Sequence, residues 1–142
     1  VCDLLQHYPI RTTLRNIDVT YFDQDHTPKS LETEYDQKLA EIISDQKWSV
    51  KNQARMHVNK GDEPYHSAAE GLSKWPEIPT CVGVKLLDDN NLVFLAPWGI
   101  EDFNNLTITS NPACRSNPQL FAERMKTKNW VQTWPKLQII WP

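Results

Sequence analysis

The sequence predicts an α+β fold, because segments with the two-residue period of strands and segments with helical spacing both occur along the chain. One predicted strand covers residues 16–23, Asn-Ile-Asp-Val-Thr-Tyr-Phe-Asp. It is rich in β-branched and aromatic residues, and its polar and apolar residues alternate. Side chains of a strand point to opposite faces in turn, so we expect Ile17, Val19 and Tyr21 to face the core together.

The opposite face of this strand carries Asn16, Asp18 and Thr20. A carboxylate in the middle of a strand is unusual, because strands are poor in Asp and an unpaired buried charge is costly. Two interpretations of Asp18 follow from this segment alone. It lies on an open, solvated sheet face, or it is a metal ligand held on a rigid element beside a cleft.

A second strand is predicted over residues 48–58. Its polar face carries Lys51, Gln53, Arg55 and His57, whereas Asn52 falls on the apolar face and needs a hydrogen-bond partner if it is buried. The polar row is compatible with a wet sheet face. It also suits an anionic ligand, because Arg offers a bidentate fork and Lys a point charge.

The helix between these strands is predicted to begin at Pro28, with Thr27 as its cap. Its apolar residues recur at helical spacing, and Glu32 belongs to the charged opposite face, for which solvent exposure is expected. The other predicted elements are a helix that ends at Tyr8-Pro9, a helix capped by Ser67 with Glu70 at the capping-box position, a hairpin over 80–96, a short extended piece at 106–109, a helix after Asn117 and a terminal strand over 137–141.

Length and composition fit one domain, residues 1–142, of an ordinary soluble protein with 39% hydrophobic and 23% charged residues. The net charge of -3 gives no strong sign of nucleic-acid binding, which usually requires a basic excess. No apolar run is long enough to span a membrane, and no signal peptide opens the chain. Because the chain starts inside a predicted helix and without Met, we expect an N-terminal piece to be missing.

The three cysteines, Cys2, Cys81 and Cys114, are far apart and show no C-x-x-C pair or zinc spacing. Reduced thiols without a disulfide are therefore expected. This cysteine usage also indicates a cytoplasmic protein.

Five sequence blocks occur in order: Asn-Ile-Asp-Val-Thr-Tyr-Phe-Asp, Val-Lys-Asn-Gln-Ala-Arg-Met-His, Lys-Trp-Pro-Glu, Ala-Pro-Trp-Gly-Ile-Glu-Asp and Trp-Pro-Lys-Leu. This series resembles a bacterial family of small nucleotidyltransferase-like proteins in the DNA polymerase beta-like superfamily. The resemblance covers nearly the whole chain. The Asn-Gln-Ala-Arg-Met-His and Ala-Pro-Trp-Gly-Ile-Glu-Asp blocks are specific, whereas an Asp-hydrophobic-Asp motif alone is weak.

The resemblance implies a mixed β-sheet with helices packed on one face and a cleft on the other. In active members of the superfamily, two carboxylates on one strand and a third on a neighbouring strand hold two magnesium ions. This chain departs from that pattern. Asp18 matches the second carboxylate, but Asn16 stands at the position of the first, and the second predicted strand has no acid. The glycine-containing phosphate-binding turn expected before the first helix is also absent.

The leading hypothesis is a magnesium-dependent nucleotidyltransferase-like protein that moves a nucleoside monophosphate from a nucleoside triphosphate (NTP) to an unknown acceptor. Its candidate catalytic residue is Asp18, and Asp18 with Asn16 is the candidate metal site. Lys51, Gln53 and Arg55 are the candidate phosphate ligands. We also expect the two strands to be adjacent, with Asp18 and Arg55 on one face.

The incomplete carboxylate set leaves open whether the chain is an enzyme. The alternative hypothesis is a non-catalytic nucleotide-binding or protein-interaction module with a degenerate active site on the same scaffold. A plain structural domain, in which the polar strand faces are merely wet, is a third interpretation.

Overall fold

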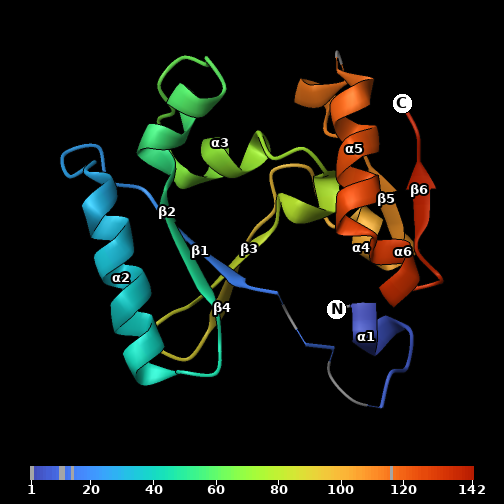
Figure 1. Cartoon of the computed structure of the whole chain (residues 1–142), viewed down its shortest axis with the longest axis horizontal. Helices are drawn as coiled ribbons and strands as arrows, with labels where there is room; N and C mark the ends of the chain where they lie inside the picture. The colour runs from blue at the N-terminus through green and yellow to red at the C-terminus, as the bar shows by residue number, and fades with distance from the viewer. Residues whose placement is uncertain (1, 10–11, 14, 116) are drawn as a thin grey trace. The chain divides into compact units, whose positions relative to one another are not determined.

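The structure is a computed structural model that describes residues 2–9, 12–13, 15–115 and 117–142 (Figure 1). Helices and strands intermix along the chain, which confirms the predicted α+β class. The described strands form three two-stranded sheets, two with parallel and one with antiparallel pairing. Backbone contacts divide the chain into two compact units: unit 1 comprises Val1–Thr12 and Leu72–Pro142, and unit 2 comprises Thr13–Gly71.

Unit 2 is built around two parallel strands, β1 (Ile17–Tyr21) and β2 (Trp48–Asn52), in a register that pairs Ile17 with Trp48 and Tyr21 with Asn52. Parallel neighbours require a crossover connection, and helix α2 (Lys29–Ile42) supplies it (Figure 1). The predicted adjacency of the two strands is therefore confirmed.

The second strand ends at Asn52, and a 3₁₀ helix, η1 (Gln53–Asn59), follows it, so the prediction of a strand as far as residue 58 is wrong. The physical reason lies in Asn52, whose side chain caps η1 by accepting a hydrogen bond from the Ala54 backbone N–H at 3.1 Å. The same amide donates to the carbonyl oxygens of Asp23 at 2.7 Å and His26 at 3.2 Å. Asn52 is fully buried and has the partners that burial demands.

Helix α2 protects the edge of β2 with two carboxylates that lie one helical turn apart. Asp36 accepts a hydrogen bond from the Val50 backbone N–H at 2.7 Å, and Glu32 accepts one from the Asn52 N–H at 2.9 Å. Four residues of helix rise about 6 Å and two residues of strand about 6.6 Å, so the two spacings match. These contacts satisfy backbone donors that an edge strand would otherwise leave unpaired.

Glu32 is 1% exposed, so the prediction that it lies on a solvated face is wrong. Apolar residues of α2 are instead exposed, among them Tyr35 and Ile42, and so is the C-cap residue Ile43. The helix begins at Lys29 with Pro28 as its N-cap and no side-chain cap, so the predicted Thr27 cap is also wrong.

The boundary between the units falls within helix α3 (Ala68–Ser73). Its predicted cap is confirmed, because Ser67 Oγ accepts a hydrogen bond from the Glu70 N–H at 3.1 Å. The Glu70 carboxylate accepts from the His66 N–H at 2.8 Å. Among the described residues of unit 2, the buried apolar ones are Val50, Ala54 and Tyr65.

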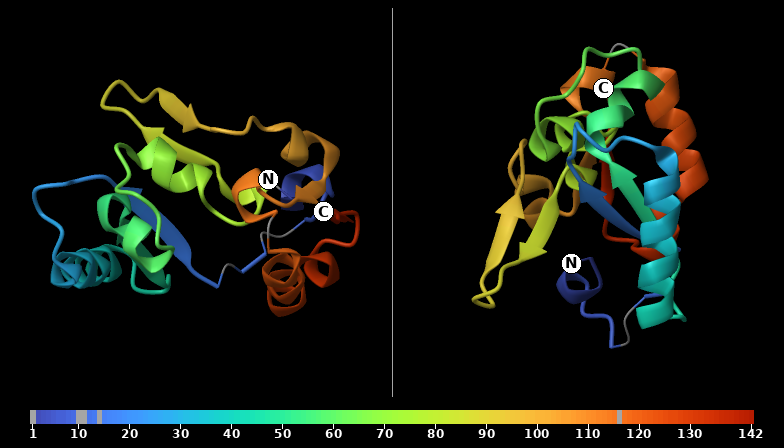
Figure 2. Two further views of the ribbon diagram at one scale, coloured as in Figure 1. Left: turned by 90° about the horizontal axis from the view of Figure 1, so that it is seen from above. Right: turned by 90° about the vertical axis from the view of Figure 1, so that its left-hand side faces the viewer.

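Unit 1 contains the remaining elements: α1 (Cys2–Leu5), η2 (Ile78–Thr80), β3 (Gly83–Leu86), β4 (Leu92–Leu95), α4 (Glu101–Asn105), β5 (Thr107–Thr109), η3 (Pro112–Cys114), α5 (Pro118–Lys128), α6 (Trp130–Thr133) and β6 (Gln138–Ile140). The predicted hairpin is confirmed as β3 and β4, which form an antiparallel ribbon (Figure 2). The predicted terminal strand is β6, and it pairs in parallel with β5.

Helix α5 begins as predicted, since the Asn117 side chain accepts a hydrogen bond from the Leu120 N–H at 3.1 Å and Pro118 occupies the first turn. It ends at Lys128, because Asn129 adopts a left-handed conformation with φ of 50°. Trp130 therefore starts a new helix, α6, and does not belong to α5.

The core of unit 1 consists of Ile108, Phe121 and Met125, with Trp130 and two residues around β6 packed against it. An ion pair with a buried carboxylate also holds α5. Arg124 donates from Nη2 to Glu77 Oε2 at 2.9 Å and from Nε to Glu77 Oε1, and the Glu77 side chain is 0% exposed.

Cys2, Cys81 and Cys114 are not joined by disulfide bonds. Among the described helices, none is long and apolar enough to cross a membrane.

Candidate functional site

All five candidate residues lie in unit 2, on or beside the β1–β2 pair. Asp18 is exposed in the middle of β1. The register places it opposite Ser49 and places Thr20 opposite Lys51, so Asp18 and Lys51 share one face of the pair. Arg55 lies beyond the end of β2, in η1, where strand alternation no longer relates it to Asp18.

Asn16 lies just before β1 and contacts Asp18 directly. Its Nδ2 donates a hydrogen bond to Asp18 Oδ1 at 2.8 Å. The amide therefore occupies one acceptor position of the Asp18 carboxylate.

The side-chain oxygens of Asp18 and Asn16 do not fit a magnesium ion that is bound in the absence of substrate. Magnesium sites in proteins use one or two carboxylates together with substrate phosphates and water, and here one carboxylate is already hydrogen-bonded to a neutral amide. Across residues 2–9, 12–13, 15–115 and 117–142, no group of three or more His, Cys, Asp or Glu side chains converges as a metal site. The described residues therefore assemble no metal site of their own.

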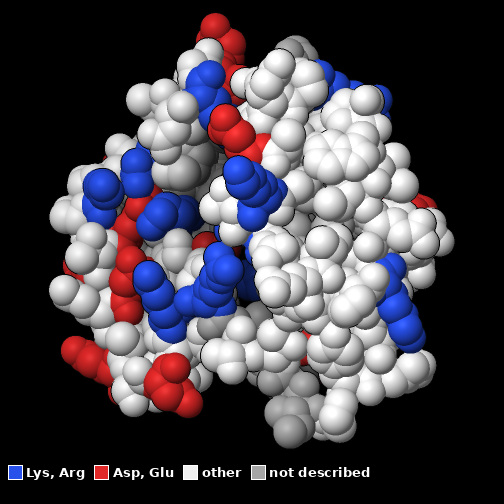
Figure 3. Space-filling view, turned by 45° about the vertical axis from the view of Figure 1, so that its right-hand side comes forward, with Lys and Arg blue, Asp and Glu red and all other residues white. Residues whose placement is uncertain are grey.

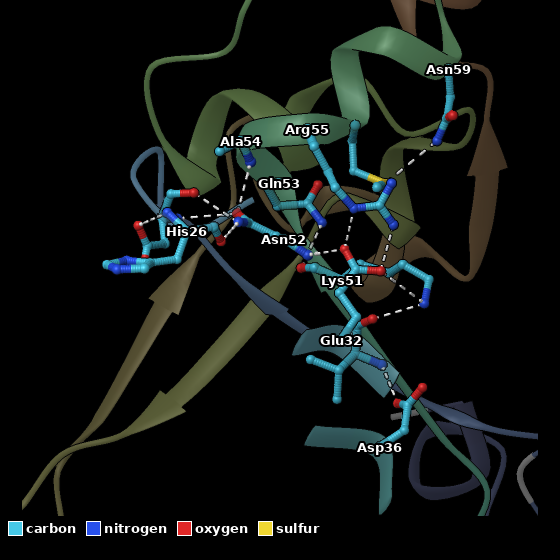
Figure 4. A network of polar contacts seen from close by, with 12 residues as sticks. His26, Glu32, Asp36, Lys51, Asn52, Gln53, Ala54, Arg55 and Asn59 are labelled. Atoms are coloured by element: carbon cyan, nitrogen blue, oxygen red, sulfur yellow. Dashed lines mark hydrogen bonds and ion pairs between the residues drawn. The ribbon is translucent and has the colours of Figure 1, made fainter. Parts of the chain in front are cut away.

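The cationic part of the site is organised by Glu32, a residue that the sequence did not single out (Figure 4). Arg55 donates from Nε to Glu32 Oε1 at 2.6 Å and from Nη2 to Glu32 Oε2 at 2.5 Å, which forms a bidentate fork. Lys51 Nζ lies 3.6 Å from Glu32 Oε2 and donates to the Val50 carbonyl oxygen at 2.7 Å.

The ion pair shifts the pKa of both partners. Burial alone raises the pKa of Glu32, but the hydrogen bonds from Arg55 and from the Asn52 N–H outweigh burial, and the pKa falls below its ordinary value. The hydrogen bond to Glu32 raises the pKa of Arg55. At neutral pH the site therefore contains one buried carboxylate and one guanidinium, both charged.

Gln53 occupies a different position from the one its predicted role needs. Its side chain is 1% exposed, and its Nε2 donates to the Lys51 carbonyl oxygen at 3.4 Å. Its Oε1 has no hydrogen-bond partner among the described residues. The side chain packs against Gly71, where an added Cβ would lie 2.7 Å from Gln53 Oε1. Gln53 thus contacts the backbone of Lys51 from the protein interior.

Charges of both signs occur around the surface. On the face drawn in Figure 3, Lys and Arg side chains gather beside Asp and Glu side chains, and a large part of the face carries neither. Unit 1 contains a cavity of about 130 Å³ whose lining is mainly apolar and includes Trp130 and Trp134. None of the five candidate residues lines this cavity, so it does not belong to the candidate site.

Comparisons with known proteins agree with this fold. A family model described as nucleotidyltransferase matches residues 1–139. A search of curated proteins returned no match. Among solved structures, an NMR structure described as revealing a CCA-adding enzyme head domain is similar, with a TM-score of 0.77 and 30% sequence identity over 89% of this chain and 68% of that chain. The chain therefore belongs to this nucleotidyltransferase family.

Proposed function

We propose that the protein binds an NTP and transfers its nucleoside monophosphate to an acceptor. The observation that carries this proposal is the family match, which extends over residues 1–139 and so includes both units. The same observation supports residues 1–142 as a single functional domain. The fold similarity to a nucleotidyltransferase head domain adds to this support.

In this proposal the phosphates contact unit 2 near Arg55 and Lys51. The Arg55 side chain is 21% exposed and the Lys51 side chain 37% exposed, so both can reach an anion at the surface. Arg provides directed N–H donors and Lys a point charge, which together suit a triphosphate. Gln53 acts through the backbone of Lys51 rather than on the ligand.

Asp18 is the proposed catalytic carboxylate. During transfer, a nucleophilic oxygen of the acceptor bonds to the α-phosphorus while the bond to the pyrophosphate leaving group breaks. The proton of that nucleophile passes to Asp18, which is exposed on the same face as Lys51. Any magnesium ion enters with the phosphates of its substrate, because Asp18 and Asn16 do not fit a resident ion.

A second function, a nucleotide-binding module without catalysis, is favoured by one specific observation. Asn16 replaces an acid and its amide is hydrogen-bonded to Asp18, so the chain's own residues leave that carboxylate partly engaged. The cationic residues Lys51 and Arg55 would still bind phosphate in such a module.

The two functions are separated by one experiment on the purified protein. Each α-labelled NTP is supplied with magnesium, binding is measured at equilibrium, and label transfer to the protein itself and to cellular RNA is then followed. The variant Asp18→Ala is compared with Asp45→Ala, which removes an exposed carboxylate from the turn before β2.

Transfer that is retained by Asp45→Ala and lost in Asp18→Ala supports the enzyme. Binding without transfer in the unmodified protein supports the module. Absence of NTP binding contradicts both functions.

A further inference from the structure

Glu32 is the only buried carboxylate among the described residues of unit 2, with 1% exposure. Three groups from β2 and η1 converge on it: the Asn52 N–H, the Arg55 guanidinium and the Lys51 ammonium. We infer that Glu32 is a positioning residue, which fixes the Nε–Nη2 edge of the Arg55 guanidinium so that the remaining N–H donors are presented to phosphate. This inference rests on the proposed function, because it assigns a role within the proposed phosphate site.

The contacts of Arg55 show how the positioning works (Figure 4). Its described hydrogen bonds use the Nε donor and one donor on Nη2, and both end on Glu32. A guanidinium has five N–H donors in a planar fork, so three donors, one on Nη2 and two on Nη1, are not used by Glu32. The Glu32 side chain is 2% exposed and that of Arg55 21%, so the carboxylate is buried whereas part of the Arg55 side chain reaches the surface.

The carboxylate is itself held firmly. Glu32 Oε1 accepts from both Arg55 Nε and the Asn52 backbone N–H, the latter at 2.9 Å. Asn52 in turn caps η1, the helix that carries Arg55. One side chain therefore orients the guanidinium and also secures the strand end from which the Arg55 backbone departs. Such preorganisation lowers the entropic cost of ligand binding.

Electrostatics and positioning make opposite predictions for Glu32→Gln. Arg55, Lys51 and Glu32 sum to one positive charge, and removal of the carboxylate charge leaves two. If net charge governed the site, triphosphate would bind more tightly to Glu32→Gln. If positioning governs it, binding weakens, because the NH2 group of a glutamine can only donate, so one of the two hydrogen bonds of the fork is lost.

The test measures binding of ATP and of inorganic triphosphate to the whole protein by calorimetry. We expect Glu32→Gln to weaken triphosphate binding about tenfold or more. Arg55→Lys retains the charge without the fork, and we expect it to weaken binding similarly. The matched control is Glu77→Gln, which breaks the corresponding buried fork to Arg124 in unit 1, and it should leave binding unchanged within about twofold while lowering stability.

A second readout does not depend on the nucleotide. Hydrogen exchange at Arg55 Nε, followed by NMR, should be slow in the unmodified protein and fast in Glu32→Gln. Unchanged or tighter triphosphate binding in folded Glu32→Gln or Arg55→Lys overturns the positioning role alone. If the unmodified protein binds no triphosphate, the proposed function fails and the inferred role fails with it, even where the exchange data show an intact fork.

Discussion

Removal of the Asp36 carboxylate should destabilise unit 2 by more than its partial exposure suggests. Asp36 accepts the Val50 N–H at 2.7 Å, and Val50 is only 2% exposed, so that donor becomes buried and unpaired in Asp36→Ala. A hydrogen bond to a charged group contributes about 1.5–3 kcal/mol, and an unsatisfied buried donor costs about 1–3 kcal/mol. We therefore expect Asp36→Ala to lower the free energy of unfolding by about 2–3 kcal/mol.

Two further variants calibrate this value. Asp36→Asn keeps a neutral acceptor and should lose about 1 kcal/mol. Glu34→Ala removes the neighbouring carboxylate, whose ion pair with Lys38 is exposed at both ends, and should lose no more than about 0.5 kcal/mol. Urea unfolding followed by circular dichroism gives all three values. Equal losses for Asp36→Ala and Glu34→Ala would refute the argument that α2 protects the strand edge.

Three other predictions address the pH dependence, packing and metal affinity. The pKa of Glu32 lies below its ordinary 4.5, so the ion pair contributes its full stability above that pH and loses it as pH falls through the folded-state pKa. The difference in unfolding free energy between the unmodified protein and Glu32→Gln, measured in urea, should therefore shrink in acid. A difference that stays constant with pH would contradict this prediction. Gly71→Ala should lower stability by about 1–3 kcal/mol, because the new Cβ meets Gln53 Oε1 at 2.7 Å; an unchanged or higher melting temperature refutes this. Asn16→Asp should strengthen magnesium binding by the free protein, and Asp18→Ala should abolish nucleotide-dependent metal binding. Both are measured by calorimetry. Tight magnesium binding by the unmodified protein without nucleotide would place the metal site elsewhere.

Much of the fold is encoded locally and was predictable for that reason. The alternation around Val19 places β1, and the short turn after Leu87 specifies the hairpin. The caps at Ser67 and Asn117 depend on contacts only three residues away, to Glu70 and Leu120. Features of this kind require no knowledge of where the rest of the chain lies.

The errors occur where a distant partner decides the outcome. Glu32 fits a polar helix face by spacing, and its burial follows from Asn52 and Arg55, which are 20 and 23 residues away. Asn52 ends its strand because its amide binds the turn after β1, 26 to 29 residues earlier. No local pattern reports such contacts. The strand alternation was right as far as Asn52 and was then overridden by them.

One signal for Glu32 was present in the sequence but becomes informative only with the topology. Glu32 and Asp36 are four residues apart on a helix, and this rise of about 6 Å equals the spacing of alternate N–H groups on a strand. Once β1 and β2 are known to be parallel, the crossover helix must pass β2, and two such acids can bind its outer edge.

This arrangement couples the fold to the proposed phosphate site. A shift of α2 by one residue would break both edge contacts and also remove Glu32 from Arg55. The orientation of the guanidinium is therefore set by the helix–strand register, which is specified by several contacts at once, rather than by Arg55 alone. The geometry of Arg55 is therefore independent of the residue at position 16, because the Glu32 carboxylate that supports it also binds the edge of β2.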